Sequence, residues 1–204
     1  MIAIIDYGVG NLRSVQKAFE ARGHDARITH DKAEIDAASH VVLPGVGAFG
    51  AAVDTLRERG LEQTALDAAR SGRPFLGICV GMQMLFDTSE EMGTHRGLGL
   101  IPGKVVRFVA QSGEKIPQIG WNALRFPRES PITAGLPDGA MAYFVHSFQC
   151  VPDNVSVAAA TTEYCGTYVS AVSVGSIHGV QFHPEKSSEI GLRILDNFAR
   201  LSHA

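Results

Sequence analysis

The chain has 204 residues, of which 45% are hydrophobic and 19% charged, and its net charge is −3. This length fits one domain with a substantial core, so we expect residues 1–204 to form a single domain. The acidic balance gives no basic surface for nucleic acid, and no apolar run reaches the length that spans a membrane. Three cysteines without a CxxC pair predict neither a disulfide scaffold nor a metal site, and nothing indicates a cofactor.

The first residues lack a basic segment and reach a charge at Asp6, so they do not resemble a signal peptide. We therefore expect a cytoplasmic protein, because a reducing compartment keeps thiols free. Asp6 itself follows a strand and precedes a turn, where polar residues are common, so we interpret it as structural.

The first half of the chain alternates strand and helix patterns. Apolar residues at helical spacing predict three helices that end near Gly23, Gly60 and Gly72. The strands predicted between them are Ile2–Asp6, Ala26–Thr29, His40–Leu43 and an apolar run that ends at Cys79. Repeated βα units predict a parallel sheet covered by helices, with any site at the carboxyl ends of its strands.

The second half is richer in strand patterns. We expect strands at Val105–Val109, Ala142–Gln149 and Val155–Thr161, then a hairpin around Gly175 built from Tyr168–Val174 and Ser176–Phe182. A final helix carries an apolar stripe at Leu192, Leu195 and Phe198, with Ser187 or Ser188 as its cap. Together the two halves predict one α/β domain with a central mixed, mostly parallel sheet flanked by helices and an antiparallel, β-rich second half.

The run Gly77-Ile78-Cys79-Val80-Gly81 stands between the apolar run and a helix-like segment, Met82–Phe86. A strand, a sharp turn framed by glycines and a helix typically raise one nucleophilic side chain above a sheet. A cysteine in an apolar run is often only a small core residue. The glycines on both sides favour the nucleophile interpretation, and the helix N-terminus would stabilise a thiolate there. Cys150 and Cys165 have no such frame, so we interpret both as structural.

A nucleophilic cysteine needs a base, and the base needs a group that orients it. His183 and Glu185 lie two residues apart at the end of a strand-like run, where alternate side chains share a face. No other histidine of the chain has a carboxylate two residues later. The sequence therefore predicts a triad of Cys79, His183 and Glu185, with the Val80 backbone N–H as the first oxyanion donor.

These motifs resemble the class I, triad-type glutamine amidotransferases. Further motifs are similar to the glutaminase subunits of imidazole glycerol-phosphate synthase, from histidine biosynthesis. They are Asp6-Tyr7-Gly8-Val9-Gly10-Asn11-Leu12, Pro44-Gly45-Val46-Gly47-Ala48-Phe49, Ile119-Gly120-Trp121-Asn122, Tyr143-Phe144-Val145-His146-Ser147 and His183-Pro184-Glu185-Lys186-Ser187-Ser188. The resemblance covers essentially the whole chain, without a departure at a catalytic position of the family. It implies the fold of that family and hydrolysis of glutamine to glutamate and ammonia.

The resemblance also implies further site residues. It places the second oxyanion donor at Val46 or Gly47. It assigns glutamine binding to Gln83, Glu91, His146 and Ser147; Gln83 lies one helical turn after the nucleophile, and a solvated helix face is the alternative for Gln83 and Glu91. Residues that face a partner would be Asn11, Trp121, Asn122, Tyr143 and Lys186, with a core position as the alternative for Trp121.

The partner that the resemblance implies is a (β/α)₈-barrel cyclase subunit, which receives ammonia in a heterodimer and makes imidazole glycerol phosphate and aminoimidazole carboxamide ribotide. Three alternatives remain at this stage. The chain could serve another synthase, for pyridoxal phosphate, anthranilate or guanylate; it could be a cysteine peptidase of similar fold; or it could be a regulatory domain without activity. The Gly120-Trp121-Asn122 motif and the intact triad argue against these alternatives and for a glutaminase subunit of imidazole glycerol-phosphate synthase.

Overall fold

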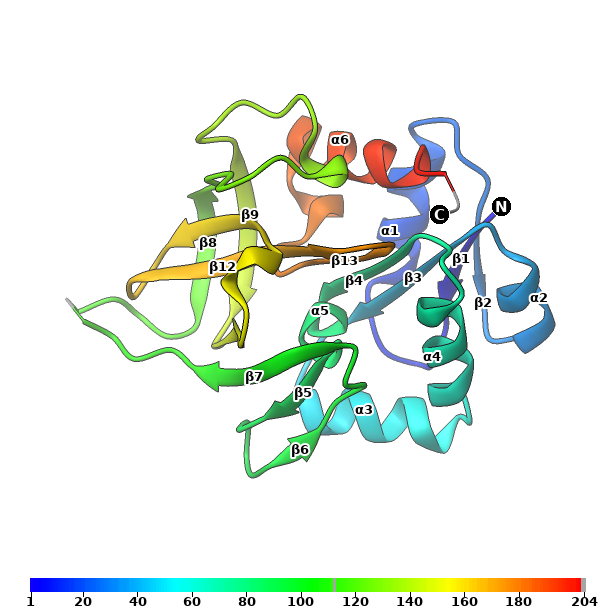
Figure 1. The fold of residues 1–204 in the computed structure, drawn as a ribbon, viewed down its shortest axis with the longest axis horizontal. Coiled ribbons are helices and arrows are strands. Elements are labelled where there is room, and N and C mark those ends of the chain that lie inside the picture. The colour runs from blue at the N-terminus through cyan, green and yellow to red at the C-terminus, as the bar shows by residue number, and fades with distance from the viewer. Residues whose placement is uncertain (112, 203–204) are drawn as a thin grey trace.

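The computed structural model describes residues 1–111 and 113–202. Five strands lie parallel in its central sheet (Figure 1). From the outer edge inward they are β2 (Ala26–Thr29), β1 (Ile2–Ile5), β3 (His40–Gly45), β4 (Phe75–Cys79) and β13 (Ile177–Val180). Most of their residues are buried because helices cover both faces, which explains their nearly continuous apolar sequences.

The same sheet continues with strands that are mostly antiparallel, and eleven strands of the described residues belong to it. The continuation runs through β12 (Thr167–Val174), β10 (Phe148–Pro152), β7 (Ile101–Arg107), β5 (Phe86–Ser89) and β6 (His95–Arg96), and β11 (Ala158–Glu163) pairs with β12. Strands β12 and β13 form the predicted hairpin, with Val174 opposite Ile177. The predicted α/β fold with a mixed central sheet and a β-rich second half is confirmed.

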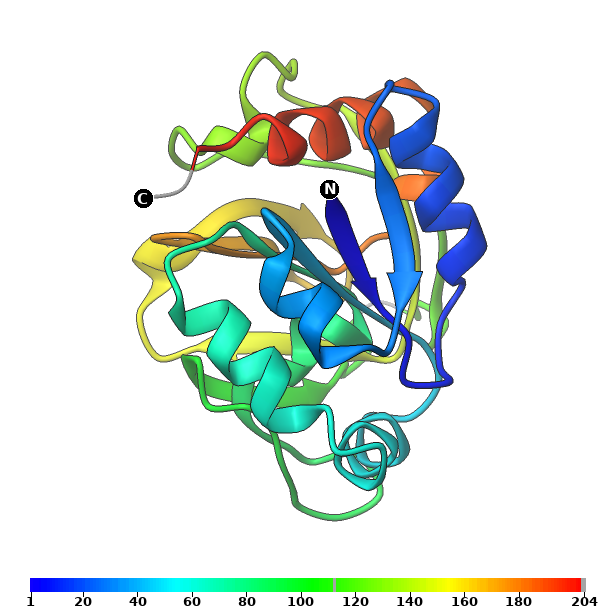
Figure 2. The same ribbon diagram turned by 90° about the vertical axis from the view of Figure 1, so that its right-hand side faces the viewer.

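Helices lie on both faces of the parallel strands. On one face α1 (Leu12–Glu20) and α6 (Ser188–Ala199) lie side by side, and on the other α2 (Lys32–Ala37) contacts α4 (Glu62–Arg70), as Figures 1 and 2 show. Two further helices are α3 (Phe49–Glu58) and the short α5 (Val80–Met84). None of the helices within the described residues is long and apolar enough to cross a membrane.

A second, two-stranded antiparallel sheet is formed by β8 (Gln118–Ala123) and β9 (Met141–His146). The sequence pattern predicts one strand over Ala142–Gln149, which is wrong, because the chain changes sheets at Ser147 and continues as β10. The pattern does not predict β8, because its apolar residues Ile119 and Trp121 are exposed whereas Gln118 is buried. The helix expected over Met82–Phe86 begins and ends two residues earlier, as α5 over Val80–Met84, since Phe86 begins β5.

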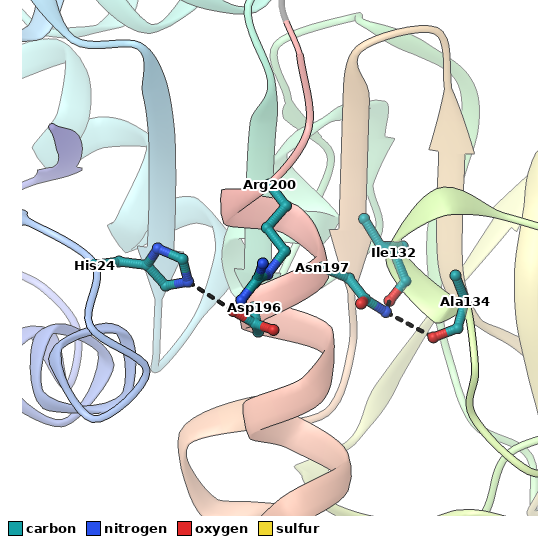
Figure 3. Close-up of polar contacts among 6 residues, drawn as sticks. All are labelled: His24, Ile132, Ala134, Asp196, Asn197 and Arg200. Carbon is teal, nitrogen blue, oxygen red and sulfur yellow. Dashed lines mark hydrogen bonds and ion pairs between the residues drawn. The ribbon is translucent and has the colours of Figure 1, made fainter.

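Helix α6 is fastened to both halves of the chain by polar contacts, drawn in Figure 3. Asp196 lies 2.8 Å from His24 Nε2, after α1, and accepts a bond from Arg200 Nε at 3.0 Å. Asn197 donates from Nδ2 to two carbonyl oxygens around the 3₁₀ turn Pro131–Thr133, over 3.2 and 2.9 Å. Because α6 follows directly after the segment that carries His183, these bonds also fix that segment against the sheet.

The register of the parallel strands brings three strand ends to one edge. Gly45 at the end of β3 lies opposite Cys79, and Val180 at the end of β13 lies opposite Ile78. The residues that follow β3, β4 and β13 therefore meet above the carboxyl end of the sheet, where ligands bind in open α/β folds.

Candidate active site

Cys79 ends β4 and precedes α5 in a strained turn. Its φ of 55° is unusual for a residue with a side chain, and such strain is typical of functional sites. The glycines on either side are required by close packing. A Cβ on Gly77 would lie 2.6 Å from the Gly81 carbonyl oxygen, and a Cβ on Gly81 would lie 1.8 Å from the Leu43 oxygen. The geometry is that of a turn which raises a nucleophile above the sheet.

His183 and Glu185 form a hydrogen-bonded pair beside this turn. Nδ1 of His183 lies 2.9 Å from Oε1 of Glu185, and their side chains are 4% and 1% exposed. The expectation that an extended strand gives them their common orientation is wrong. Strand β13 ends at Val180, and a 3₁₀ turn over Pro184–Lys186 follows His183, so the turn brings the carboxylate back to the ring.

The electrostatics of His183 favour its protonated form. Burial by itself lowers the pKa of His183, but hydrogen bonds to Cys79 and Glu185, together with the charges of both, raise it to about 9. The imidazole therefore lies between a thiol and a carboxylate and holds its proton at neutral pH. A protonated imidazole beside a thiol can supply the proton donor for a nucleophilic reaction at that sulfur.

A cavity of about 270 Å³ opens in front of Cys79. It brings together all the residues for which we predicted oxyanion or glutamine contacts, along with Cys79, His183 and Lys186. Its lining consists of Val46, Gly47, Cys79, Val80, Gln83, Glu91, Val145, His146, Ser147, Phe148, His183 and Lys186. Glu185 is not part of the lining, because it lies behind His183.

Gln83 lines the cavity, and a second glutamine, Gln181, which the sequence motifs do not indicate, lies behind it. Gln83 is 3% exposed and donates from Nε2 to Oε1 of Gln181, 3.1 Å away. Gln181 is completely buried, and its Nε2 points to the Cys79 sulfur at 3.8 Å. The only signal for Gln181 in the sequence is a polar residue inside the apolar run from Gly179 to Phe182.

Glu91 has a structural contact at the rim of the cavity. Its Oε2 accepts a hydrogen bond of 2.7 Å from the backbone N–H of Phe49, the first residue of α3. The residue at the N-cap position of α3 is Ala48, whose side chain cannot accept this bond. The Glu91 carboxylate therefore caps α3 from a distant loop, and its expected contact with the glutamine ammonium group stays a prediction.

Three of the residues predicted to face a partner lie together, and one of them, Lys186, lines the cavity. Trp121 and Tyr143 are opposite each other on β8 and β9, with ring centroids 6.0 Å apart. Nζ of Lys186 lies 5.9 Å from the centre of the Tyr143 ring. Trp121 is 47% exposed, so the alternative that it is a core residue is wrong.

The other two predicted partner residues differ. The Asn122 side chain accepts a hydrogen bond from Gln118 within β8, over 2.8 Å. Asn11 is exposed at the N-terminus of α1, where its side chain makes no capping hydrogen bond.

Comparison with known proteins agrees with this fold. A family model described as glutamine amidotransferase class-I matches residues 3–201, and the chain belongs to this family. Among its relatives is the imidazole glycerol phosphate synthase subunit HisH of Syntrophotalea carbinolica, which is 52% identical over 203 residues, covering 97% of this chain and 98% of that protein. The HisH subunit of Moorella thermoacetica is 50% identical over 200 residues, covering 98% and 94%.

Among solved structures, the fold resembles PurLQS from Thermotoga maritima. The TM-score is 0.76 at 20% sequence identity, and the match covers 97% of this chain and 96% of that chain. At this level of identity the likeness concerns the fold alone.

Proposed function

We propose that this chain is the glutaminase subunit of an imidazole glycerol phosphate synthase. It hydrolyses glutamine to glutamate and ammonia and delivers the ammonia to a cyclase subunit, which makes imidazole glycerol phosphate and aminoimidazole carboxamide ribotide in histidine biosynthesis. The observation that carries this proposal is the strained Cys79 turn facing the buried His183–Glu185 pair across one cavity. The 52% identity to a HisH subunit over nearly the whole chain supports the particular synthase.

In the proposed reaction the Cys79 thiolate attacks the side-chain amide carbon of glutamine. The carbonyl oxygen becomes an oxyanion, which the backbone N–H of Val80 and a second N–H at Val46 or Gly47 stabilise. Loss of one such donor typically lowers the rate ~10²–10³-fold. His183 donates its proton to the leaving nitrogen, ammonia departs, and a thioester remains on Cys79.

The second half of the reaction returns the enzyme to its starting state. Neutral His183 takes a proton from water, and the resulting hydroxide attacks the thioester carbon. The Cys79 thiolate leaves with the electron pair of the C–S bond, and glutamate is released. In both steps Glu185 accepts a hydrogen bond from Nδ1–H of His183, so it orients the ring and stabilises its positive charge.

The partner surface in this proposal surrounds the mouth of the cavity. Trp121, Tyr143 and Lys186 form one cluster there, and Asn11 and Asn122 extend the surface that meets the barrel-shaped cyclase. Large aromatic residues of this kind are enriched in binding hot spots. Gly47 has a φ of +81°, a backbone conformation that glycine adopts without strain. In this proposal the peptide next to Val46 has two orientations, with its N–H facing the oxyanion or turned away from it. The bound partner selects the orientation that faces the oxyanion.

Two further parts of the proposal concern the whole chain. One core extends from Ile2 to Phe198, which supports a single domain over residues 1–204. All three cysteines are free thiols, which suits the reducing cytoplasm, where we place the enzyme.

The experiment that tests the proposed function is a glutaminase assay with and without the cyclase subunit and its ribonucleotide ligand. We expect glutamine hydrolysis that rises when the liganded cyclase is added. A cysteine peptidase would instead cleave peptides and ignore glutamine, and a regulatory domain would turn over neither. A glutaminase of another synthase would hydrolyse glutamine without a response to this cyclase.

A further inference from the structure

A line of buried polar side chains leads away from the cavity. Gln181 contacts the Cys79 sulfur and accepts a hydrogen bond from Gln83. Gln83 also donates to the carbonyl oxygen of Phe148 at 3.3 Å, and Nδ1 of His146 lies 2.7 Å from the same oxygen. The Phe148 carbonyl therefore joins the hydrogen-bonded pair of Gln83 and Gln181 to His146 in the cavity wall.

The line continues beyond the cavity into the small sheet. Nε2 of His146 lies 3.2 Å from the hydroxyl of Tyr168, and this hydroxyl donates to Oε1 of Gln118 at 2.9 Å. Gln118 in turn donates to Asn122 on the same strand. Gln118 lies opposite His146 in the β8–β9 register, so Tyr168 bridges two cross-strand neighbours. Tyr168 is 4% exposed and Gln118 is completely buried.

The Tyr168 hydroxyl is the junction that fixes His146. Burial lowers the pKa of His146 to about 4, so the ring is neutral and carries one N–H. A carbonyl oxygen only accepts, so this N–H lies on Nδ1 and donates to Phe148. Nε2 is then an acceptor, and the neighbouring Tyr168 hydroxyl shares its single proton between this nitrogen at 3.2 Å and Oε1 of Gln118 at 2.9 Å. Without that hydroxyl the buried nitrogen loses its partner.

We propose that Tyr168 is a positioning residue for the glutamine substrate. It does not line the cavity, and it acts through His146 to hold the Phe148 carbonyl and the Gln83 amide in place. The inference rests on the proposed function. In it, one hydrogen-bonded network supports both the cavity wall and strand β8, which carries Trp121.

The test compares Tyr168→Phe with a matched control in the complex with the cyclase. Tyr168 packs against the ring of Phe108 with centroids 5.1 Å apart, so phenylalanine retains the packing and removes only the hydroxyl. The control is Tyr164→Phe, because Tyr164 also packs on Phe108 but donates its hydroxyl proton to the Lys115 carbonyl, outside the line.

We expect Tyr168→Phe to raise the KM for glutamine about three- to tenfold, the worth of one buried hydrogen bond. The kcat and the synthesis from ammonium salts should stay close to wild type. A glutamine-shaped chloroketone should need a higher concentration for half-maximal labelling of Cys79, whereas iodoacetamide, which has no glutamine groups, should react at the wild-type rate.

Three other results would each contradict either the positioning role of Tyr168 or the proposed function. If wild type turns over glutamine and Tyr168→Phe matches it in KM and in chloroketone labelling, the positioning role is wrong and the proposed function stands. If both reagents and kcat change together, the hydroxyl supports only general structure, and the positioning role is again wrong. If wild type itself does not hydrolyse glutamine in the complex, the proposed function is wrong, and the inference with it.

Discussion

The hydroxyl of Ser187 donates a 2.7 Å hydrogen bond to the carbonyl oxygen of His183 and accepts one of 2.9 Å from the backbone N–H of Tyr143. The sequence pattern predicts Ser187 or Ser188 as the cap of α6. Ser187 occupies the cap position, but its side chain makes no capping bond. The serine instead fastens the proposed base to strand β9.

Replacement of Ser187 should therefore affect both stability and turnover. In Ser187→Ala the buried N–H of Tyr143 loses its acceptor, and we expect unfolding to become easier by about 1–3 kcal/mol. The kcat for glutamine should also fall, because the His183 backbone is free to shift. Thermal unfolding and glutaminase assays measure the two effects. Ser188→Ala, at an exposed neighbour, is the control and should resemble wild type. An unchanged kcat in Ser187→Ala would contradict the link to His183.

Replacement of the proposed nucleophile should separate synthesis from glutamine from synthesis that uses added ammonium salts. Cys79→Ala should abolish synthesis from glutamine and leave synthesis from added ammonium salts intact, because the cyclase needs only ammonia. Burial raises the pKa of the Cys150 thiol, so Cys150→Ala is a suitable control and should keep both activities. A chloroketone analogue of glutamine should label only Cys79 in peptide maps. Appreciable glutamine turnover by Cys79→Ala would contradict its role as nucleophile.

The proposed base and its orienting carboxylate should act as one unit. His183→Asn should remove nearly all glutamine turnover, because the ring transfers protons twice in each cycle. Glu185→Gln should lose less, since the carboxylate orients and stabilises the ring. The double variant should be little worse than His183→Asn alone. Steady-state kinetics of the three variants in the complex test this, and additive losses would place the action of Glu185 elsewhere.

Stability should decrease on the acid side because two buried histidines remain neutral. Burial lowers the pKa of His146 and of His178 to about 4. As the pH falls from about 6.5, the usual value, towards 4, the unfolded chain binds protons that the native state does not. Each group can thereby remove up to ~3 kcal/mol of unfolding free energy. His183 has the opposite sign, since its raised pKa gives a contribution that is lost as the pH rises through about 9.

Denaturant titrations between pH 7 and pH 4.5 measure this effect. The variant His178→Gln should show a shallower loss of stability than wild type, because it lacks one of the two groups. His30→Gln, at an exposed histidine, should keep the wild-type profile. Equal slopes for wild type and His178→Gln would show that His178 does not cause the acid loss.

Local pattern in the sequence predicts part of the fold. Strand β2 has the bounds expected from it, and the glycine-framed turn at Cys79 is recognisable because its packing requires glycine at two fixed positions. Helix α2 was missed, although Asp31 caps it by accepting from Ala33 N at 2.8 Å. It buries only Ile35, so its apolar periodicity is too weak to predict a helix.

The support around the site could not be predicted from local pattern. Gln181 contacts Cys79 across 102 positions of the chain, and Tyr168 reaches Gln118 across 50. Such contacts depend on the register of β13 against β4 and on the pairing of β8 with β9, which no single segment encodes. Motifs therefore indicate the groups that we propose to react, whereas the residues that hold these groups are visible only in the tertiary structure.

Control by the partner should depend on the cluster of Trp121, Tyr143 and Lys186. Trp121 and Tyr143 pack edge to face at 68°, and Lys186 lies over the Tyr143 ring, directly after Glu185 in the chain. A partner bound to this cluster would act on the segment that carries the proposed base. Trp121→Ala and Lys186→Ala should therefore reduce stimulation by the cyclase ligand more than they reduce basal glutaminase activity. Assays with and without ligand, at saturating cyclase, give the ratio. Lys32→Ala, at the start of α2 beside the opposite edge of the sheet, is the control and should keep full stimulation. If Trp121→Ala and Lys186→Ala also keep full stimulation in a tight complex, these two residues do not couple the partner to the active site.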